Sequence, residues 1–458
     1  MRRLGAGRRA PPRPGGAADD RPASLASSAS LLLGTQIVGN AGYFVAVLLL
    51  ARGLGPTDRG QVAFITVTAM VTARCANLGL NEAVRVLAAQ RPADRPALLG
   101  NLLLAVTVLA IAAALLVTGA LAALPGVRPP GIDGPQLVIL GLATLATALV
   151  AAGYAYLQGC SRFGPYGLIQ ATGPWLYAVL LAAAWAGPGL TATRAAAIWV
   201  GAQALPAMVM VSACARGIGI GAPRAALLRE SIRFGVRAWA GGFAHFLNAR
   251  TDQILIALIA SEATLGVYAV AVNASEILFY LPTAVAAALL PAVAREEARD
   301  RAAQRTLAIF RAVTLVTGAA ILLAAILGPV LIPLVFGDPY RGAVDPFLWL
   351  LPSALGFAAS ATFSSALVAS GAPGLSSLGP AVSLVLGIAL DLVLIPAYGA
   401  SGAAAASSAA LLAGGAAAAS AYRSRSGFAW SALLPRAGDV RTLRLLARRA
   451  RRARAATA

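Results

Sequence analysis

Residues 234–294, FGVRAWAGGFAHFLNARTDQILIALIASEATLGVYAVAVNASEILFYLPTAVAAALLPAVA, determine how the rest of the chain is interpreted. The stretch predicts two membrane-spanning helices, over 234–260 and 265–292, joined by a short turn at Ser261–Leu265. Polar side chains nevertheless fall at depths that hydrocarbon should occupy: His245, Asn248, Arg250, Asp252, Asn273 and Glu276. A charged side chain in lipid is costly unless it faces a partner or a water-filled cavity. The stretch therefore predicts a polar cavity inside a helical bundle.

The composition of the whole chain agrees with a membrane location. Of its 458 residues, 59% are hydrophobic and 12% are charged, and the mean hydropathy is +0.77. A soluble domain carries about 25% charged residues. Apolar runs recur from end to end, each close to the roughly 20 residues that cross a bilayer core of about 30 Å. We therefore expect an all-α integral membrane protein.

Twelve of these runs are expected to span the membrane. We place them at residues 28–51, 60–84, 98–124, 136–158, 165–187, 193–215, 234–260, 265–292, 306–336, 345–370, 374–396 and 400–422. An even number of spans puts both termini on one side. The tails and the loops on that side carry 28 arginines, whereas the opposite loops carry five. Because basic segments stay on the cytoplasmic side, both termini are predicted to be cytoplasmic, in a bacterial plasma membrane.

The chain divides into five segments. We expect a disordered basic tail, a lobe of six helices, a basic cytoplasmic linker, a second lobe of six helices and a second basic tail, over residues 1–27, 28–215, 216–233, 234–422 and 423–458 respectively. Within the second tail, Val440–Arg454 fits either a solvated basic tail or a basic amphipathic helix on the inner leaflet.

Several classes of function do not fit this composition. The chain has a net charge of +20, and most of its 37 arginines lie in the tails and alternate loops, which indicates membrane topology rather than nucleic-acid binding. The three cysteines lack metal-ligand spacing, and the chain has one histidine. None of the expected outer loops is long enough to form a catalytic domain. We therefore predict a transporter and no enzyme, without a metal or cofactor, and leave open coupling to protons or sodium.

The two halves of the chain resemble each other. LGPTDRGQVAFITV, which contains Gly60, matches SEATLGVYAVAV, which contains Gly266, at an offset of 206 residues. A second pair of similar segments places Gly159 and Gly371 in equivalent positions, 212 residues apart. Similar offsets indicate duplication. With six spans each, the halves are parallel, and such halves enclose a site near the middle of the membrane.

Four segments carry a resemblance to a known family. They are LARGLGPTDRGQVAF (50–64), NLGLNEAVRVLA (77–88), the block 234–295, and VASGAPGLSSLGPAVSLVLGIALDLVLIPAYGASGAAAASS (368–408). Because these segments occur in this order and at this spacing, the chain resembles the multidrug/oligosaccharidyl-lipid/polysaccharide (MOP) flippase superfamily, in its O-antigen and polysaccharide branch. The resemblance extends over about residues 28–422.

The resemblance implies two six-helix lobes around a V-shaped cavity that opens to each side in turn. It also implies a cargo, a polyprenyl-diphosphate-sugar that moves from the inner to the outer leaflet. The expected partners are this lipid-linked sugar, the bilayer and polysaccharide polymerase or glycosyltransferase machinery, with no nucleic acid, and the chain is expected to be a monomer. Two alternatives within the superfamily stay open, a drug/cation antiporter and a lipid II flippase. A polyprenyl-linked glycosyltransferase is disfavoured because the outer loops are short.

Polar residues share one face on each of four expected helices, which predicts a single water-filled cleft. The four sets are Gln36, Asn40 and Tyr43; Arg74, Asn77 and Asn81; His245, Asn248 and Asp252; and Asn273, Glu276 and Tyr280. Guanidinium groups bind a diphosphate through paired hydrogen bonds, so Arg74 and Arg250 are the candidate headgroup ligands. We expect the sugar hydroxyls to contact Asn40, Asn77, Asn81 and Asn248. The candidates for ion coupling are Asp252, Glu276 and His245.

Each of these residues also has a structural alternative. Arg250 could form a fixed ion pair with Asp252 or Glu276, and Arg74 could serve helix packing. His245 fits a cavity wall as well as a proton relay, and buried asparagines often bond only to a neighbouring helix.

Three further expectations concern local structure. Glu82 is expected to pair with Arg85, and Asp391 to reach interfacial water at the outer end of its helix. Pro282, six residues after Glu276, is expected to act as a hinge because proline removes a backbone hydrogen bond.

Overall fold

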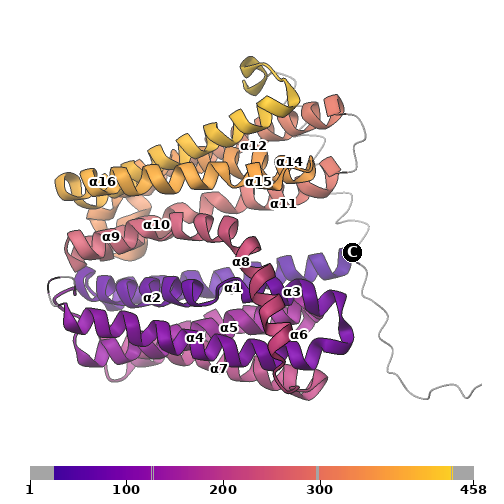
Figure 1. The fold of residues 1–458 in the computed structure, drawn as a ribbon. Coiled ribbons are helices and arrows are strands. Elements are labelled where there is room, and N and C mark those ends of the chain that lie inside the picture. The colour runs from indigo at the N-terminus through magenta and orange to yellow at the C-terminus, as the bar shows by residue number, and fades with distance from the viewer. Residues whose placement is uncertain (1–24, 125, 127, 295–298, 435, 437–458) are drawn as a thin grey trace, which may run out of the picture.

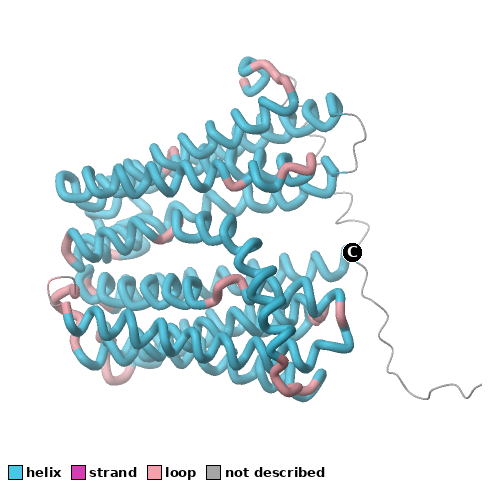
Figure 2. Tube along the Cα trace, viewed as in Figure 1, coloured by secondary structure: helices cyan, strands magenta, loops and turns pink. Residues whose placement is uncertain are grey.

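The computed structural model describes residues 25–124, 126, 128–294, 299–434 and 436. Throughout these residues the regular elements are helices, and most of them run side by side in two lobes (Figures 1 and 2). Helices α1–α7 form one lobe, and α9–α16 form the other. Helix α8 crosses from the first lobe to the second (Figure 1). The predicted all-α fold of two lobes is confirmed.

The first lobe follows the expected spans with one difference. Its helices are α1 (Leu25–Gly53), α2 (Pro56–Ala76), α3 (Leu80–Gln90), α4 (Arg95–Ala123), α5 (Gly134–Gly159), α6 (Phe163–Ala186) and α7 (Ala192–Ile218). The expected second span is not one helix, because the chain bends by 54° between α2 and α3. Leu78 and Gly79 have φ angles of 47° and 78°, which a right-handed helix does not allow. The prediction of an unbroken helix over 60–84 is therefore wrong.

The second lobe contains several broken helices. They follow α8 (Ala225–Asn248) in the order α9 (Thr251–Ile259), α10 (Glu262–Ser275), α11 (Tyr280–Ala294), α12 (Arg299–Phe336), α13 (Val344–Leu350), α14 (Ser353–Ala369), α15 (Pro373–Ser376) and α16 (Leu378–Ser426). Helix α16 contains two expected spans, because Gly399 changes the chain direction with φ 55° and ψ −129°. A 3-10 turn, Glu276–Phe279, separates α10 from α11. Pro282 lies in the first turn of α11, beside this irregular segment, and its role as a hinge stays a prediction.

The protein is a multi-pass membrane protein. In the described part of the chain, eight helices are long and apolar enough to cross a membrane, or ten if each of two bent pairs is one span. Large apolar side chains such as Leu116 and Ile326, both 73% exposed, cover the outside. In water such a surface would be unfavourable, whereas lipid tails solvate it. If α16 is counted as two spans divided at Gly399, and α8 and α9 together are counted as one more, the total is consistent with the twelve predicted spans.

Two glycines allow α8 to pack closely on the first lobe. A Cβ atom on Gly79 would lie 2.1 Å from the carbonyl oxygen of Gly235, and one on Gly235 would lie 2.3 Å from that of Gly79. Real side chains do not approach a backbone oxygen so closely. The position of α8 therefore depends on the absence of a side chain at both residues.

We expect Gly79→Ala to destabilise the protein more than Gly189→Ala does. Both glycines have positive φ, 78° and 84°, so each alanine adds backbone strain of about 1–2 kcal/mol. Only Gly79 has a close neighbour, whereas a Cβ on Gly189 would meet nothing within 4 Å. Melting temperatures of the two variants in detergent measure the difference. Equal losses would mean that the contact between Gly79 and Gly235 contributes nothing to stability.

Candidate functional site

A cavity of about 530 Å³ lies between the two lobes. It is bordered by α1, α2, α6 and α7 from the first lobe and by α9, α10 and the turn after α10 from the second. Its polar lining residues are Gln36, Asn40, Tyr43, Arg59, Thr66, Tyr177, Gln203, Arg250, Gln253, Asn273, Glu276 and Tyr280. The expected cleft between the halves is therefore present, with the polar stripes predicted for the first and eighth spans. We call it the central cavity.

Arg250 enters the central cavity from a break between two helices. It follows α8 and precedes α9, with φ −136° and ψ −13°. Its Nη1 donates hydrogen bonds to Glu276 Oε1 and to the Ala249 carbonyl oxygen, both at 2.9 Å. The side chains of Arg250 and Glu276 remain 20% and 30% exposed. The guanidinium is thus neutralised by a carboxylate but still accessible from the cavity.

Arg59 is a functional candidate that sequence reasoning missed. The predicted spans leave it among the five arginines of the outer loops, but it lies in the first turn of α2, lines the central cavity and is 5% exposed. The described residues provide it with no ion-pair partner, and its Nε is buried without a hydrogen bond. Pro56 at the first helical position was the available signal, because proline favours helix starts. Starting the helix there places Arg59 on the same face as Thr66.

Arg74 lies outside the described lining of the central cavity. Its Nη2 donates to Glu82 Oε1 at 2.9 Å, and its guanidinium carbon is 6.0 Å from the centre of the Phe246 ring. The expected Glu82–Arg85 pair is wrong, because the bend after α2 turns Glu82 back toward Arg74. The ion pair fits the structural alternative for Arg74, and its role in binding a headgroup stays a prediction.

Asn77 and Asn81 lie at the same bend and are both 3% exposed. The Asn81 backbone N–H donates to Asn77 Oδ1 at 3.1 Å, which stabilises the start of α3. The amide atoms Asn77 Nδ2 and Asn81 Oδ1 are buried without a hydrogen-bond partner, and neither residue is among those that line the central cavity. The structure thus does not bring this pair to Arg250, and their contact with sugar stays a prediction.

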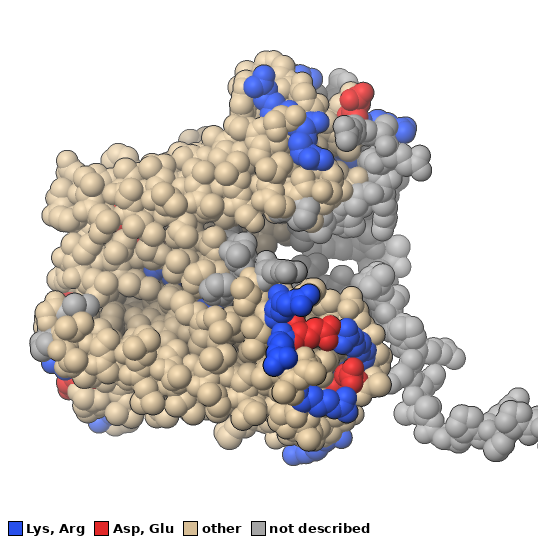
Figure 3. Space-filling view, viewed as in Figure 1, with Lys and Arg blue, Asp and Glu red and all other residues tan. Residues whose placement is uncertain are grey.

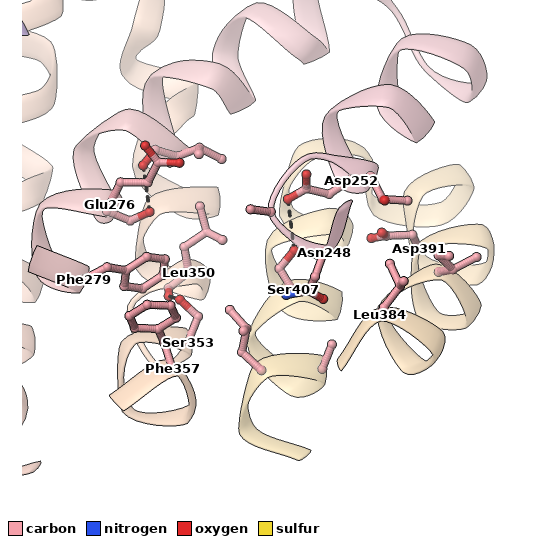
Figure 4. A pocket seen from close by; sticks show the side chains of 18 residues that line it. Asn248, Asp252, Glu276, Phe279, Leu350, Ser353, Phe357, Leu384, Asp391 and Ser407 are labelled. Carbon is pink, nitrogen blue, oxygen red and sulfur yellow. Dashed lines mark hydrogen bonds between the residues drawn. The ribbon is translucent and has the colours of Figure 1, made fainter. Parts of the chain in front are cut away.

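A second cavity, of about 230 Å³, lies within the second lobe. Figure 4 shows Asn248, Asp252, Asp391 and Ser407 grouped on one side of it and Glu276 on the other. We call it the lobe cavity. Glu276 therefore borders both cavities, while Asn248 and Asp252 face the lobe cavity and not the central one. We predicted that all four polar faces line a single cleft. For the face of the seventh span that carries Asn248 and Asp252, this prediction is wrong.

Asp252 is the most fully bonded group in the lobe cavity. Its Oδ2 accepts hydrogen bonds from the Tyr268 hydroxyl at 2.5 Å and from Ser407 Oγ at 3.1 Å. Its Oδ1 accepts from the Gln253 backbone N–H at 2.7 Å. Of the two ion-pair partners that the sequence left open for Arg250, the structure therefore has Glu276 and not Asp252, because these three donors hold Asp252 in the second lobe.

Asp391 differs from the expectation made for it. It is 3% exposed and lines the lobe cavity, so the prediction that it reaches interfacial water is wrong. Its Oδ1 is buried without a hydrogen-bond partner. The cause is that Gly387 and Asp391, one turn apart on α16, face the cavity beside Asn248. A buried carboxylate oxygen that lacks a donor can accept a proton or bind a cation.

The remaining predicted residues are placed as follows. Asn40 lines the central cavity, where its Oδ1 accepts a hydrogen bond from Gln36 at 3.0 Å. His245 belongs to α8, but its side chain lies outside the described part of the structure. Among the described residues, no group of three or more His, Cys, Asp or Glu side chains could hold a metal ion.

A family model described as polysaccharide biosynthesis protein matches residues 49–345. The chain belongs to this family. No curated protein matches the chain in sequence.

The fold of this polysaccharide biosynthesis protein is also found in solved membrane transporters. Lipid II flippase MurJ in an inward closed conformation is 12% identical, with a TM-score of 0.69 over 86% of each chain. An inward-facing multidrug resistance MATE family transporter of the MOP superfamily is 13% identical, with a TM-score of 0.69 over 87% of this chain and 98% of that one. An outward-facing MATE family transporter is 14% identical, with a TM-score of 0.57 over 87% of this chain and 95% of that one. The chain thus has the MOP fold.

Proposed function

We propose that the protein flips a lipid-linked oligosaccharide, a polyprenyl-diphosphate-sugar, from the inner to the outer leaflet for cell-surface polysaccharide export. The observation that carries the proposal is the pair of arginines, Arg59 and Arg250, that face one cavity from opposite lobes. The polysaccharide biosynthesis family and the MOP fold support it.

The charge of the central cavity favours an anionic cargo. Its ionisable lining groups, apart from tyrosine, are the guanidinium groups of Arg59 and Arg250 and the carboxylate of Glu276, so their formal charge is +1. A diphosphate could bind Arg59 directly and could compete with Glu276 for Arg250. Side-chain amides around them, including Asn40 and Asn273, suit sugar hydroxyls. A cavity for cationic drugs would need the opposite charge, whereas a lipid II flippase would share this diphosphate chemistry and stays the main alternative.

The outer end of the central cavity is closed, under the predicted topology, where α2 crosses α10. A Cβ atom on Gly60 would lie 1.8 Å from the Glu262 carbonyl oxygen, and one on Gly266 would lie 1.9 Å from that of Pro56. These are the two glycines that the sequence repeat pairs. The Glu262 carboxylate also accepts hydrogen bonds from Gln61 Nε2 at 2.8 Å and from the Gly131 N–H at 2.6 Å.

This closure supports an inward-facing state for the structure. The higher TM-score with the inward-facing than with the outward-facing MATE transporter points the same way. In alternating access, α2 and α10 would move apart at Gly60 and Gly266 while the inner end of the cavity closes.

We further propose that the lobe cavity couples flipping to a cation, either a proton or sodium. Asp252, Asp391 and Ser407 provide oxygen atoms there, and the unpartnered Asp391 Oδ1 is the open ligand position. Glu276 borders this cavity and also binds Arg250, so it connects the two sites. A cation near Glu276 would weaken the ion pair between Glu276 and Arg250. The guanidinium group would then be available to bind the diphosphate.

Flipping of a fluorescent polyprenyl-diphosphate-sugar in proteoliposomes tests the cargo. We expect Arg59→Gln and Arg250→Gln each to slow flipping about tenfold or more, because a charged hydrogen bond contributes about 1.5–3 kcal/mol. Arg341→Gln is the matched control, since Arg341 lies on the surface and pairs only with Asp338 among the described residues. Normal flipping by both cavity variants would make the arginines structural. No flipping of such lipids by the wild type would move the proposal to the drug/cation antiporter.

The outer closure predicts an accessibility change. In a background without native cysteines, Thr66→Cys in the central cavity should react slowly with an impermeant thiol reagent applied from the outside. Adding Gly266→Ala should raise the rate several-fold, because the new Cβ forces α2 and α10 apart. Gly318→Ala is the control, since nothing lies within 4 Å of that position. A rate that Gly266→Ala leaves unchanged would contradict the proposed closure.

Cation coupling predicts that an imposed proton or sodium gradient changes the rate of flipping by the wild type. We expect Asp391→Asn to abolish the response to the gradient and to leave slow, gradient-independent flipping. Asp345→Asn, a change at a residue that borders neither cavity, should keep the response. Separate proton and sodium gradients identify the ion. A gradient response that survives in Asp391→Asn would exclude the lobe cavity as the coupling site.

A further inference from the structure

The first turns of α8, residues 225–236, lie across the end of the first lobe (Figure 1). Arg91 donates to both carboxylate oxygens of Glu230, at 2.8 and 2.7 Å, which lowers the pKa of Glu230. Arg224 donates to Asp94 at 3.0 Å. We call this stretch the α8 base. Its residues 225–233 belong to the predicted basic cytoplasmic linker, and the structure shows that they are helical.

Buried hydrogen bonds fix the start of the α8 base. The Asn101 side chain, 2% exposed, donates to the Arg224 carbonyl oxygen at 3.0 Å and accepts from the Arg224 N–H at 2.9 Å. Gly235 completes the attachment at the other end of the stretch, through its contact with Gly79. The α8 base is therefore held rigidly on the first lobe.

The α8 base has a buried face and an outer face, and the outer face carries apolar as well as charged side chains. Its inner face buries Leu227, Ser231 and Gly235, which are spaced by four residues. Its outer face is not simply polar. It carries the half-buried Leu228 and Ile232 together with the exposed Arg229, Arg233 and Val236, while the exposed Phe234 lies on the opposite flank of the helix, near Glu230.

Part of this surface forms a shallow notch of about 400 Å³, which is lined by Ala225, Leu228, Arg229, Ile232 and Arg233. Arg229 and Arg233 lie one turn apart beside it, and in the part of the chain that the structure describes neither has an ion-pair partner. Figure 3 shows that charged side chains gather at this end of the molecule, where Figure 1 places α3 and α8, and that the flanks are largely uncharged.

We propose that the α8 base is a binding site for an anionic phospholipid of the inner leaflet. The phosphate binds between Arg229 and Arg233, and the upper part of an acyl chain lies along Leu228 and Ile232. The proposal rests on the orientation in the proposed function, which places this end of the bundle at the inner leaflet.

The chemistry of the surface favours lipid over a soluble partner. An exposed helical face that carries both apolar and cationic side chains is well solvated at the level of the lipid headgroups, because the apolar groups reach the acyl chains while the arginines stay beside the phosphates. Anionic lipids attract each arginine near the surface, and the charge of the notch complements a phosphate. Phe234, 41% exposed next to Arg233, fits the acyl boundary and would be unfavourable in water.

The site has a consequence for the transport cycle. The α8 base is fixed to the first lobe, while α8 also packs on α16 of the second lobe and ends at Asn248, two residues before Arg250. A lipid at the α8 base therefore binds the one helix that connects the lobes and leads into the central cavity. We expect the lipid to stabilise the inward-facing arrangement.

Native mass spectrometry of the purified full-length protein in detergent tests the site. Phosphatidylglycerol and phosphatidylcholine with equal acyl chains are titrated separately. We expect the wild type to prefer phosphatidylglycerol, and the Arg229→Gln/Arg233→Gln variant to bind it about thirtyfold less tightly, because each of the two arginines contributes about 1 kcal/mol toward an anionic headgroup. The matched control, Arg128→Gln/Arg341→Gln, removes the same charge from the opposite end of the bundle.

A second variant separates the acyl contact from charge. Leu228→Ser/Ile232→Ser keeps both arginines and should weaken binding of long-chain phosphatidylglycerol while leaving that of its short-chain analogue unchanged. Glycerol phosphate should not compete, because a free phosphate lacks the acyl chain. Equal affinity of wild type and Arg229→Gln/Arg233→Gln, or an equal loss in the Arg128→Gln/Arg341→Gln control, would overturn the proposal. The measurement involves no transport, so its failure would leave the proposed flippase function untouched.

Discussion

The free energy needed to keep arginine inside a membrane protein constrains the rest of this structure. Two guanidinium groups, those of Arg59 and Arg250, face a cavity between two lobes whose outer surfaces are apolar. A cation in hydrocarbon is unfavourable, so each group needs water, a counter-charge or an anionic ligand. Glu276 provides the counter-charge for Arg250. Arg59 has no such partner among the described residues, which leaves the cavity positive and suited to an anion.

Breaks in the helices place these charges. Arg250 follows the end of α8, where the helix stops and α9 begins, and Glu276 begins the 3-10 turn between α10 and α11. Such breaks leave backbone groups without helical partners, and in a membrane these groups persist only beside a cavity or protein. Arg250 Nη1, for example, bonds the Ala249 carbonyl oxygen at 2.9 Å. The irregular backbone and the buried charges therefore support each other.

The internal repeat explains how the two lobes meet. Gly60 and Gly266 occupy equivalent positions in the two halves, and the structure places them on the two helices that cross, α2 and α10. Close approach of two helices requires small residues on both sides of the crossing. The glycines that indicated duplication are thus also the residues that let α2 and α10 approach closely.

The sequence by itself determined the all-α fold, the approximate spans, the repeat and the presence of a polar interior, because these follow from hydrophobicity and spacing along the chain. It also placed Arg250, Asp252 and Glu276 inside the membrane, but it left open which of the two carboxylates pairs with Arg250. The tertiary structure decided which cavity each group faces. Arg250 and Asp252 are two residues apart, yet one faces the central cavity and the other is bonded within the second lobe by Tyr268 and Ser407. Side-chain direction depends on where helices bend and rotate, and contacts between distant segments set those bends.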